Sequence, residues 1–241
     1  MPELWVSDLG QMPYAEALEI QRAVARDRIA GVVAEDVLLL VEHPPVVTLG
    51  RTSKAAHLTA SPALLAARGV ELFEVERGGD VTFHGPGQLV GYPVIDLKRH
   101  RQDLHWYLRQ LEGALIDALC ELGIGAEPRA GLTGVWTGGR KIASIGVHAR
   151  DWVTWHGFAL NVTTDLSYFD LMVPCGIAGV EMTSVARELG RGPDAAAVRD
   201  AVVEGVARRF GLTIRDQRLA ISDWLSDQRS AISDQQLLVS D

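Results

Sequence analysis

The sequence predicts an α/β protein, because amphipathic helical segments are interspersed with short apolar or alternating segments typical of β-strands. The composition is that of an ordinary globular protein: 47% of the residues are hydrophobic, 22% are charged and the mean hydropathy is +0.09. A chain of 241 residues forms one large α/β domain or two small ones, and it can bury a substantial core.

Charge and cysteine content narrow the class of function. The formal net charge is −8 and no broad basic stripe is present, which argues against a nucleic-acid-binding protein. The two cysteines, Cys120 and Cys175, are too few for a disulfide framework and suit the reducing cytoplasm. The first residues lack the order of a signal peptide, and no apolar run approaches the roughly 18 residues of a membrane span. We therefore expect a cytoplasmic protein that does not act in a membrane.

Three helices are expected. Residues 14–29 place apolar side chains on one helical face, and 103–122 give the clearest helix, with Asp103 as N-cap and Gly123 as its end. Cys120 lies beside the leucine stripe of the second helix, so we interpret it as a packing residue. A third helix follows Asp194 and ends before Gly211.

The expected strands lie between these helices. The apolar run 37–41 is typical of a strand buried on both faces, and the two prolines at 44–45 end it. Residues 132–147 predict a β-hairpin whose two-residue turn is the glycine pair at 138–139. Further strands are expected at 46–49, 71–75, 89–95 and 156–162.

The densest glycine region spans residues 77–88 and holds four glycines within ten residues. Such a run predicts tight turns at which a ligand approaches the backbone closely. Its spacing is neither that of a dinucleotide fingerprint nor that of a P-loop. His84 stands between a strand and a Gly-Pro-Gly turn, and the sequence alone leaves open whether it is catalytic or positional.

Cys175 lies on a Pro-Cys-Gly turn and is the candidate nucleophile. A thiol attacks as its thiolate, and a cysteine with an ordinary pKa of about 8.5 is mostly protonated at neutral pH. Lys141 is the candidate neighbour that ionises it. Strand alternation places Lys141 on the face of Ala143, Ile145 and Val147, where a desolvated lysine can act as a base. In the alternative interpretation, Cys175 is a small buried hydrophobe and Lys141 a solvated surface charge.

Other chemistries find less support in the sequence. The seven histidines and two cysteines show no Cys-x-x-Cys or His-Glu-x-x-His spacing, so we expect no metal site. No Gly-x-Ser-x-Gly elbow is present, which disfavours a serine hydrolase of that type. A cysteine protease arrangement with His84 or His156 stays open, because such partners meet in space rather than in sequence.

Four ordered blocks resemble the signatures of the lipoyl(octanoyl) transferases, the lipoate biosynthesis protein B family. These blocks are 77–89 with Tyr92-Pro93, 140–147, 156–162 and 174–177. The resemblance runs from about Val6 to Leu212. Phe83 stands where many members have Tyr, and Ser144 where many have Ala.

The resemblance implies a mixed β-sheet packed with helices, the fold shared with the catalytic domains of biotin and lipoate protein ligases. It implies one catalytic domain over residues 1–213, and we expect the repetitive Ser/Asp-rich tail 214–241 to be disordered. By resemblance, Cys175 forms an acyl-thioester intermediate, Lys141 lowers its pKa and shuttles protons, and no cofactor is needed. The residues expected to bind the acyl group are Arg77, Gly78, Gly79, Asp80, Val81, Thr82, Phe83, His84, Ser144, Ile145, Gly146, Gly157, Phe158 and Ala159.

The implied reaction transfers an octanoyl or lipoyl group from acyl carrier protein to a lysine of a lipoyl domain. The acceptors would be the E2 subunits of 2-oxoacid dehydrogenases and the glycine-cleavage H protein, and we expect the enzyme to act as a monomer. The basic cluster 98–101 is a candidate docking site for the acidic carrier. Two alternatives stay open: an ATP-dependent lipoate–protein ligase of the same fold, and a non-enzymatic module that binds an acyl or lipoyl carrier.

Overall fold

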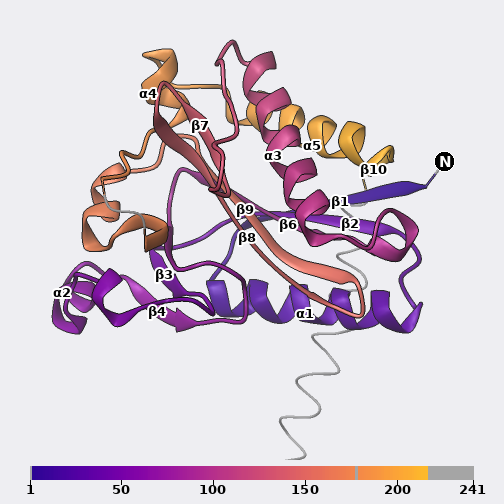
Figure 1. Cartoon of the computed structure of the whole chain (residues 1–241), viewed down its shortest axis with the longest axis horizontal. Helices are drawn as coiled ribbons and strands as arrows, with labels where there is room; N and C mark the ends of the chain where they lie inside the picture. The colour runs from indigo at the N-terminus through magenta and orange to yellow at the C-terminus, as the bar shows by residue number, and fades with distance from the viewer. Residues whose placement is uncertain (1, 177–178, 217–241) are drawn as a thin grey trace, which may run out of the picture.

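The computed structural model describes residues 2–176 and 179–216, apart from the side chains of Cys175 and Asp216. Among these residues, seven strands form one mixed sheet in the order β10-β1-β2-β6-β9-β8-β7 (Figure 1). Strand β1 pairs in parallel with β10 and β2, and the remaining pairs are antiparallel. The strands are β1 Glu3–Gln11, β2 Asp36–Glu42, β6 Gln88–Val94, β7 Val135–Thr137, β8 Arg140–Arg150, β9 Val153–Asn161 and β10 Thr213–Asp216.

A second, three-stranded sheet lies beside the first. Its central strand β3 (Val46–Leu49) pairs in parallel with β4 (Glu71–Glu74) and antiparallel with β5 (Val81–His84). The two prolines after β2 separate β3 from the large sheet, because proline cannot continue the hydrogen-bonded ladder. The expected mixed sheet packed with helices is confirmed.

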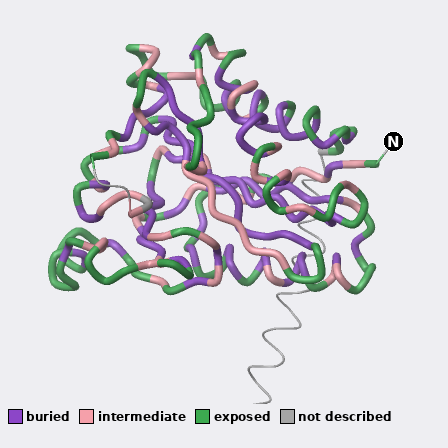
Figure 2. Tube along the Cα trace, in the orientation of Figure 1, coloured by how far each residue is buried: buried purple, intermediate pink, exposed green. Residues whose placement is uncertain are grey.

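Helices cover both faces of the large sheet. Helix α1 (Tyr14–Ala30) lies along one face, and α3 (Leu104–Glu121) and α5 (Ala195–Phe210) lie together on the other (Figure 1). Alternate residues of β2 serve the two layers: Leu38 and Leu40 belong to the core under α3 and α5, and the intervening Leu39 belongs to the core under α1. Figure 2 shows this burial along the central strands.

Helices α3 and α5 touch each other through small residues. A Cβ on Gly205 would lie 2.5 Å from the carbonyl oxygen of Ala114, so the backbones approach as closely as glycine permits. The shorter helices complete the connections: η1 Ala55–His57, α2 Pro62–Ala67, η2 Leu97–Arg99, η3 Leu166–Leu171, η4 Pro174–Gly176 and α4 Val185–Leu189. No helix among the described residues combines the length and apolar character that crossing a bilayer requires.

The structure confirms the three predicted long helices and their caps. Asp103 accepts a hydrogen bond from the Trp106 backbone N–H, and Asp194 accepts one from Ala196. Strands β1 and β10 were not predicted. Because β10 runs to Asp216, the fold extends three residues past the expected boundary at 213, and the rest of the tail, 217–241, lies outside the described residues.

The predicted hairpin forms, with Gly138 and Gly139 at φ values of 52° and 80° as a type I′ turn requires. Val135 pairs with Ala143 whereas Trp136 pairs with Lys141, so one extra residue interrupts β8 between them. This β-bulge breaks the strict alternation on which the expected face of Lys141 depended. Contacts beyond the strand therefore decide where the lysine side chain lies.

Candidate active site

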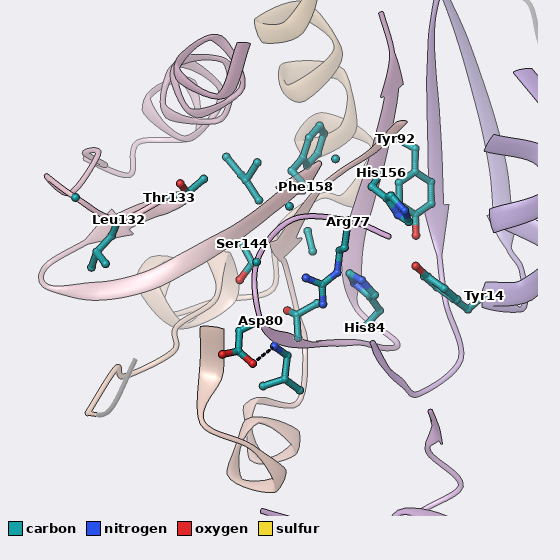
Figure 3. Close-up of a pocket in the computed structure, with 18 residues that line it drawn as sticks. Tyr14, Arg77, Asp80, His84, Tyr92, Leu132, Thr133, Ser144, His156 and Phe158 are labelled. Carbon is teal, nitrogen blue, oxygen red and sulfur yellow. Dashed lines mark hydrogen bonds between the residues drawn. The ribbon is translucent and has the colours of Figure 1, made fainter. Parts of the chain in front are cut away.

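A cavity of about 250 Å³ lies where β5 of the small sheet faces β8 and β9 of the large one (Figure 3). Its wall is completed by the segment that precedes β5, by Tyr14 of α1, by Tyr92 of β6 and by the loop before β7. The candidate acyl-binding residues come together on this wall, with the exception of Gly78 and Phe83.

The two exceptions support the wall from behind. The Gly78 N–H donates to the Val147 carbonyl at 2.8 Å, which ties the glycine-rich segment to β8. Phe83 belongs to the core of the small sheet and stacks on Tyr168 with ring centroids 4.6 Å apart. We therefore expect a change at Phe83 to act through packing rather than through direct contact with a ligand.

Glycines allow backbone segments to pack closely at the cavity. A Cβ on Gly146 would lie 2.9 Å from the carbonyl oxygen of Gly78, in the segment before β5, and one on Gly157 would lie 2.5 Å from the Pro93 ring of β6, in the same sheet. Contacts this short exclude a side chain at either position. The glycine-rich pattern is thus explained by close packing of backbone against backbone.

Arg77 anchors the glycine-rich segment to β3. Its Nη2 donates to the carbonyl and the hydroxyl of Thr48 at 2.7 and 2.8 Å, and its Nε donates to the same hydroxyl at 3.1 Å. Its Nη1 donates to the Gly78 carbonyl at 3.1 Å. A guanidinium held in this way fixes the segment that follows it, since the planar donor fork allows few alternative geometries.

His84 lies on one wall of the cavity as a neutral imidazole. Its Nδ1 donates to Gln88 Oε1 at 2.8 Å, so its Nε2 carries the lone pair. Burial lowers the pKa of His84 to about 3, and burial likewise raises the pKa of Tyr14, whose ring stacks on His84, to about 12. His84 and Tyr14 are therefore uncharged at neutral pH, and the guanidinium of Arg77 is a charged group beside them.

Lys141 is buried, with 1% of its surface exposed, so its interpretation as a solvated surface charge is wrong. The Nζ donates to the carbonyl oxygen of Thr133 at 3.2 Å and lies 5.5 Å from the centre of the Trp136 ring. Thr133 is part of the cavity wall (Figure 3). The lysine therefore adjoins the cavity on the side of the loop that precedes β7.

The turn that carries Cys175 adjoins the cavity through Asp80. Gly176 has a φ of 68°, and its missing Cβ leaves room for the side chains of Asp80 and His57. His57 Nδ1 is hydrogen-bonded to Asp80 Oδ2 at 2.5 Å, and the His57 carbonyl accepts from the Val173 N–H at 2.7 Å. Asp80 lines the cavity. The Cys175 side chain, and with it the predicted contact between thiol and lysine, lies outside the described part of the chain.

Several cavity residues were not among the expected acyl-binding residues. They are Tyr14, Tyr92, Gly131, Leu132, Thr133 and His156. His156 offers the clearest missed signal, because it precedes Gly157 in a recognised block and was considered only as a possible partner of a catalytic cysteine. Its φ of 56° within a strand is rare for a residue with a side chain and turns the backbone locally. Among the described residues, no group of His, Cys, Asp and Glu side chains is arranged to hold a metal ion.

Comparisons with known proteins agree with this geometry. Residues 13–207 match the model of the lipoyl protein ligase A/B catalytic domain. An octanoyltransferase of Gloeobacter violaceus is 50% identical over 203 residues, which cover 84% of this chain and 88% of the relative. An octanoyltransferase of Solibacter usitatus is 56% identical over 169 residues, which cover 70% of this chain and 76% of the relative.

Solved structures share the fold at low sequence identity. A lipoate-protein ligase A bound with ATP superimposes with a TM-score of 0.76 and 18% identity, over 90% of this chain and 88% of that one. The biotin protein ligase of Aquifex aeolicus gives a TM-score of 0.52 at 14% identity, over 88% of this chain and 71% of that one. The match over most of the catalytic domain and the close octanoyltransferase relatives lead to one assignment: the chain belongs to the lipoyl protein ligase A/B catalytic-domain family, in its octanoyltransferase branch.

Proposed function

We propose that this enzyme transfers an octanoyl group from acyl carrier protein to a lysine of a lipoyl domain, through a thioester on Cys175. The observation that carries octanoyl transfer is the identity of 50% and 56% to proteins named octanoyltransferase. The cavity, which is built largely from the blocks recognised in this sequence, supports it. The structural likeness to an ATP-bound ligase supports only the fold, because its identity is 18%.

In the first half-reaction, the Cys175 thiolate attacks the carbonyl carbon of the octanoyl thioester. The bond from this carbon to the carrier's sulfur breaks, and the carrier leaves as a thiol after it takes up a proton. One thioester replaces another, so the step needs no nucleotide. The buried ammonium of Lys141 would stabilise the thiolate and supply that proton.

In the second half-reaction, the amine of the acceptor lysine attacks the Cys175 thioester. The carbon–sulfur bond breaks, an amide forms, and Cys175 leaves as a thiolate while the amine gives up a proton. This order predicts ping-pong kinetics, with the carrier released before the acceptor binds. Backbone N–H groups near Cys175-Gly176 or near His84-Gly85 are candidates to stabilise the oxyanion of both steps, and of these the Gly176 N–H already donates to the Val173 carbonyl at 2.9 Å.

One part of the cavity wall, formed by His84 and Tyr14, suits an octanoyl chain because it is uncharged; Arg77 and Asp80 also line the cavity, where they hydrogen-bond to Thr48 and to the Val81 N–H. Neutral His84 and Tyr14 can border an alkyl chain without the cost of burying an ion. Each buried methylene contributes about 0.8 kcal/mol, so the apolar part of an octanoyl group is held by several kcal/mol. Gly146 and Gly157 present bare backbone to the cavity, and the space that their side chains would fill is taken by Gly78 and by Gly91 and Pro93.

The docking site proposed at residues 98–101 needs a more selective test than neutralising the whole cluster. His100 is bound to Asp36 at 2.6 Å in the fold, whereas Lys98 and Arg101 keep 43% and 63% of their side chains exposed. We expect Lys98→Gln combined with Arg101→Gln to weaken use of octanoyl carrier protein and to flatten its salt dependence. A small octanoyl thioester should react at the wild-type rate, and an equal loss with both donors would contradict docking at this site.

Intact-protein mass spectrometry tests the reaction itself. After incubation with octanoyl carrier protein, the wild type should gain one octanoyl group, and Cys175→Ala should gain none. Cys120→Ala is the matched control, because Cys120 is exposed and should keep the adduct on Cys175 in place. Absence of an adduct on the wild type rejects the thioester route, and a lipoylated product formed from free acid only when ATP is present would favour the ligase alternative.

A further inference from the structure

Helix α3 carries a buried carboxylate that the proposed reaction does not use. Glu112 is 1% exposed and lies behind the loop before β7, away from the cavity wall. Its burial needs an explanation, because a carboxylate taken out of water is costly unless it is paired and hydrogen-bonded. Burial raises the pKa of this carboxyl, and the Gly134 N–H and the charges of Arg109 and Lys141 oppose that rise.

The partners of Glu112 lead directly to the loop beside the cavity. Its Oε1 accepts a hydrogen bond from the Gly134 N–H at 3.0 Å. Its Oε2 lies 2.6 Å from Nη1 of Arg109, one turn earlier on the same helix. One oxygen of the carboxylate thus accepts a hydrogen bond from a peptide N–H, and the other lies beside the positive charge of an arginine.

The same peptide group contacts Lys141. The N–H of Gly134 and the carbonyl of Thr133 belong to one peptide unit, and the carbonyl accepts from Lys141 Nζ at 3.2 Å. Because a trans peptide is planar, its N–H and C=O point in opposite directions. When Glu112 fixes the N–H, it therefore also aims the carbonyl at the lysine.

Gly134 brings the lysine side chain onto this peptide. A Cβ at Gly134 would lie 2.6 Å from Cε and 3.2 Å from Nζ of Lys141, so only glycine lets the two meet. Its φ of 135° is also one that other residues rarely adopt. A carboxylate bonded to the N–H polarises the peptide and strengthens its carbonyl as an acceptor for the ammonium group.

From this geometry we infer that Glu112 is a positioning residue, which holds the Lys141 amine in place through the Thr133–Gly134 peptide. The inference rests on the role of Lys141 in the proposed function. Glu112 lies on α3 and does not touch the acyl group. Its loss should therefore lower the fraction of Cys175 that is ionised and should leave the acyl cavity formed. Arg109 on α3 and Lys141 on β8 are the charged groups that face it.

Alkylation of Cys175 by iodoacetamide tests the inference, in a Cys120→Ala background that removes the exposed second thiol. Glu112→Ala should slow alkylation at pH 7 by about tenfold or more, the size of a lost hydrogen bond to a charged group. Glu112→Gln keeps an oxygen acceptor for Gly134 and should recover most of the rate. Asp117→Asn, which removes a carboxylate further along α3 that pairs with Arg209, should alkylate as the parent does.

Lys141→Met separates failure of the inference from failure of the proposed function. If this variant alkylates at the parent rate, the role of Lys141 is wrong and the inference falls with it. If Lys141→Met is slow while Glu112→Ala matches the parent, the inference alone is overturned. An equal loss in Glu112→Ala and Glu112→Gln also overturns it, because the charge rather than the peptide would then carry the effect. Thermal unfolding checks that each variant is folded; if Glu112→Ala is not, Glu112→Leu, which keeps the volume of the side chain and removes the acceptor, takes its place with the same expected loss.

Discussion

Two neutral histidines buried beside the cavity predict that the fold is sensitive to mild acid. His43 Nδ1 donates to the Met12 carbonyl at 2.7 Å, and its Nε2 accepts from the Tyr92 hydroxyl at 2.7 Å. Both ring nitrogens are therefore satisfied only in the neutral form. Burial lowers the pKa of His43 from 6.5 to about 4, and it lowers that of His84 to about 3.

The direction and size of the effect follow from proton linkage. The unfolded chain binds these protons near pH 6.5 and the folded chain only in stronger acid, so stability is complete above that pH and falls as the pH drops below it. For a shift from 6.5 to about 4, His43 alone should lower the free energy of unfolding by about 2 kcal/mol between pH 7.5 and pH 5. His84 adds to this loss in the same pH range.

Urea unfolding at pH 7.5, 6.5, 5.5 and 5.0 measures this fall in the free energy of unfolding. These pH values lie above those at which most carboxylates titrate. His43→Gln keeps a donor for Met12 and an acceptor for Tyr92 but removes the ionisable ring. The variant should start from a lower stability, and its stability should fall less steeply with pH than that of the wild type. His105→Gln, at an exposed histidine, is the control. Parallel pH dependences for His43→Gln and the wild type would refute a buried neutral His43.

Substitutions at three further positions test the turn at Gly176, the contact between α3 and α5, and the N-cap of α5. Gly176→Ala should slow formation of the octanoyl-enzyme in mass spectrometry, since its Cβ would overlap Asp80 and His57 at a φ of 68°; an unchanged rate would contradict a tightly held turn. Gly205→Ala should lower the free energy of unfolding by about 1–3 kcal/mol, because α3 and α5 must separate; equal stability would show that the helices adjust freely. Asp194→Ala should cost about 1 kcal/mol and Asp194→Ser much less, both measured by urea unfolding, if the side chain caps α5.

The long elements could be predicted because each carries its own pattern. The helix at α3 shows a leucine stripe with Asp103 and Gly123 at its ends, and β2 is a short run buried on both faces. Strand β1 gave no such signal: its buried and half-buried residues do not alternate regularly, and it is held by parallel pairing with β2 and β10. Pairing between distant segments decides such a strand, and a single sequence does not display it.

The cavity residues divide in the same way. Those in the recognised blocks, such as His84 and Ser144, were expected from the sequence and lie on the wall. Tyr14 and Thr133 were not expected as site residues, because the first looks like an ordinary buried position of α1 and the second lies in a loop before the hairpin. The face of Lys141 could not be derived from strand alternation, because the bulge in β8 shifts the register.

The proposed site draws its residues from the two sheets, and this explains why glycines lie at the contact between them. Lys141 is held on the large sheet by the loop before β7, and the turn at Gly176 is held by Asp80 and His57 beside the small sheet. Only a close approach of the sheets can bring the two parts to one acyl group. Gly146 against Gly78 provides that approach, since a Cβ there would lie 2.9 Å from a carbonyl oxygen. A methyl group at Gly146 would have to push the small sheet away. It should therefore slow transfer even though Lys141 and the turn at 174–176 keep their own supports.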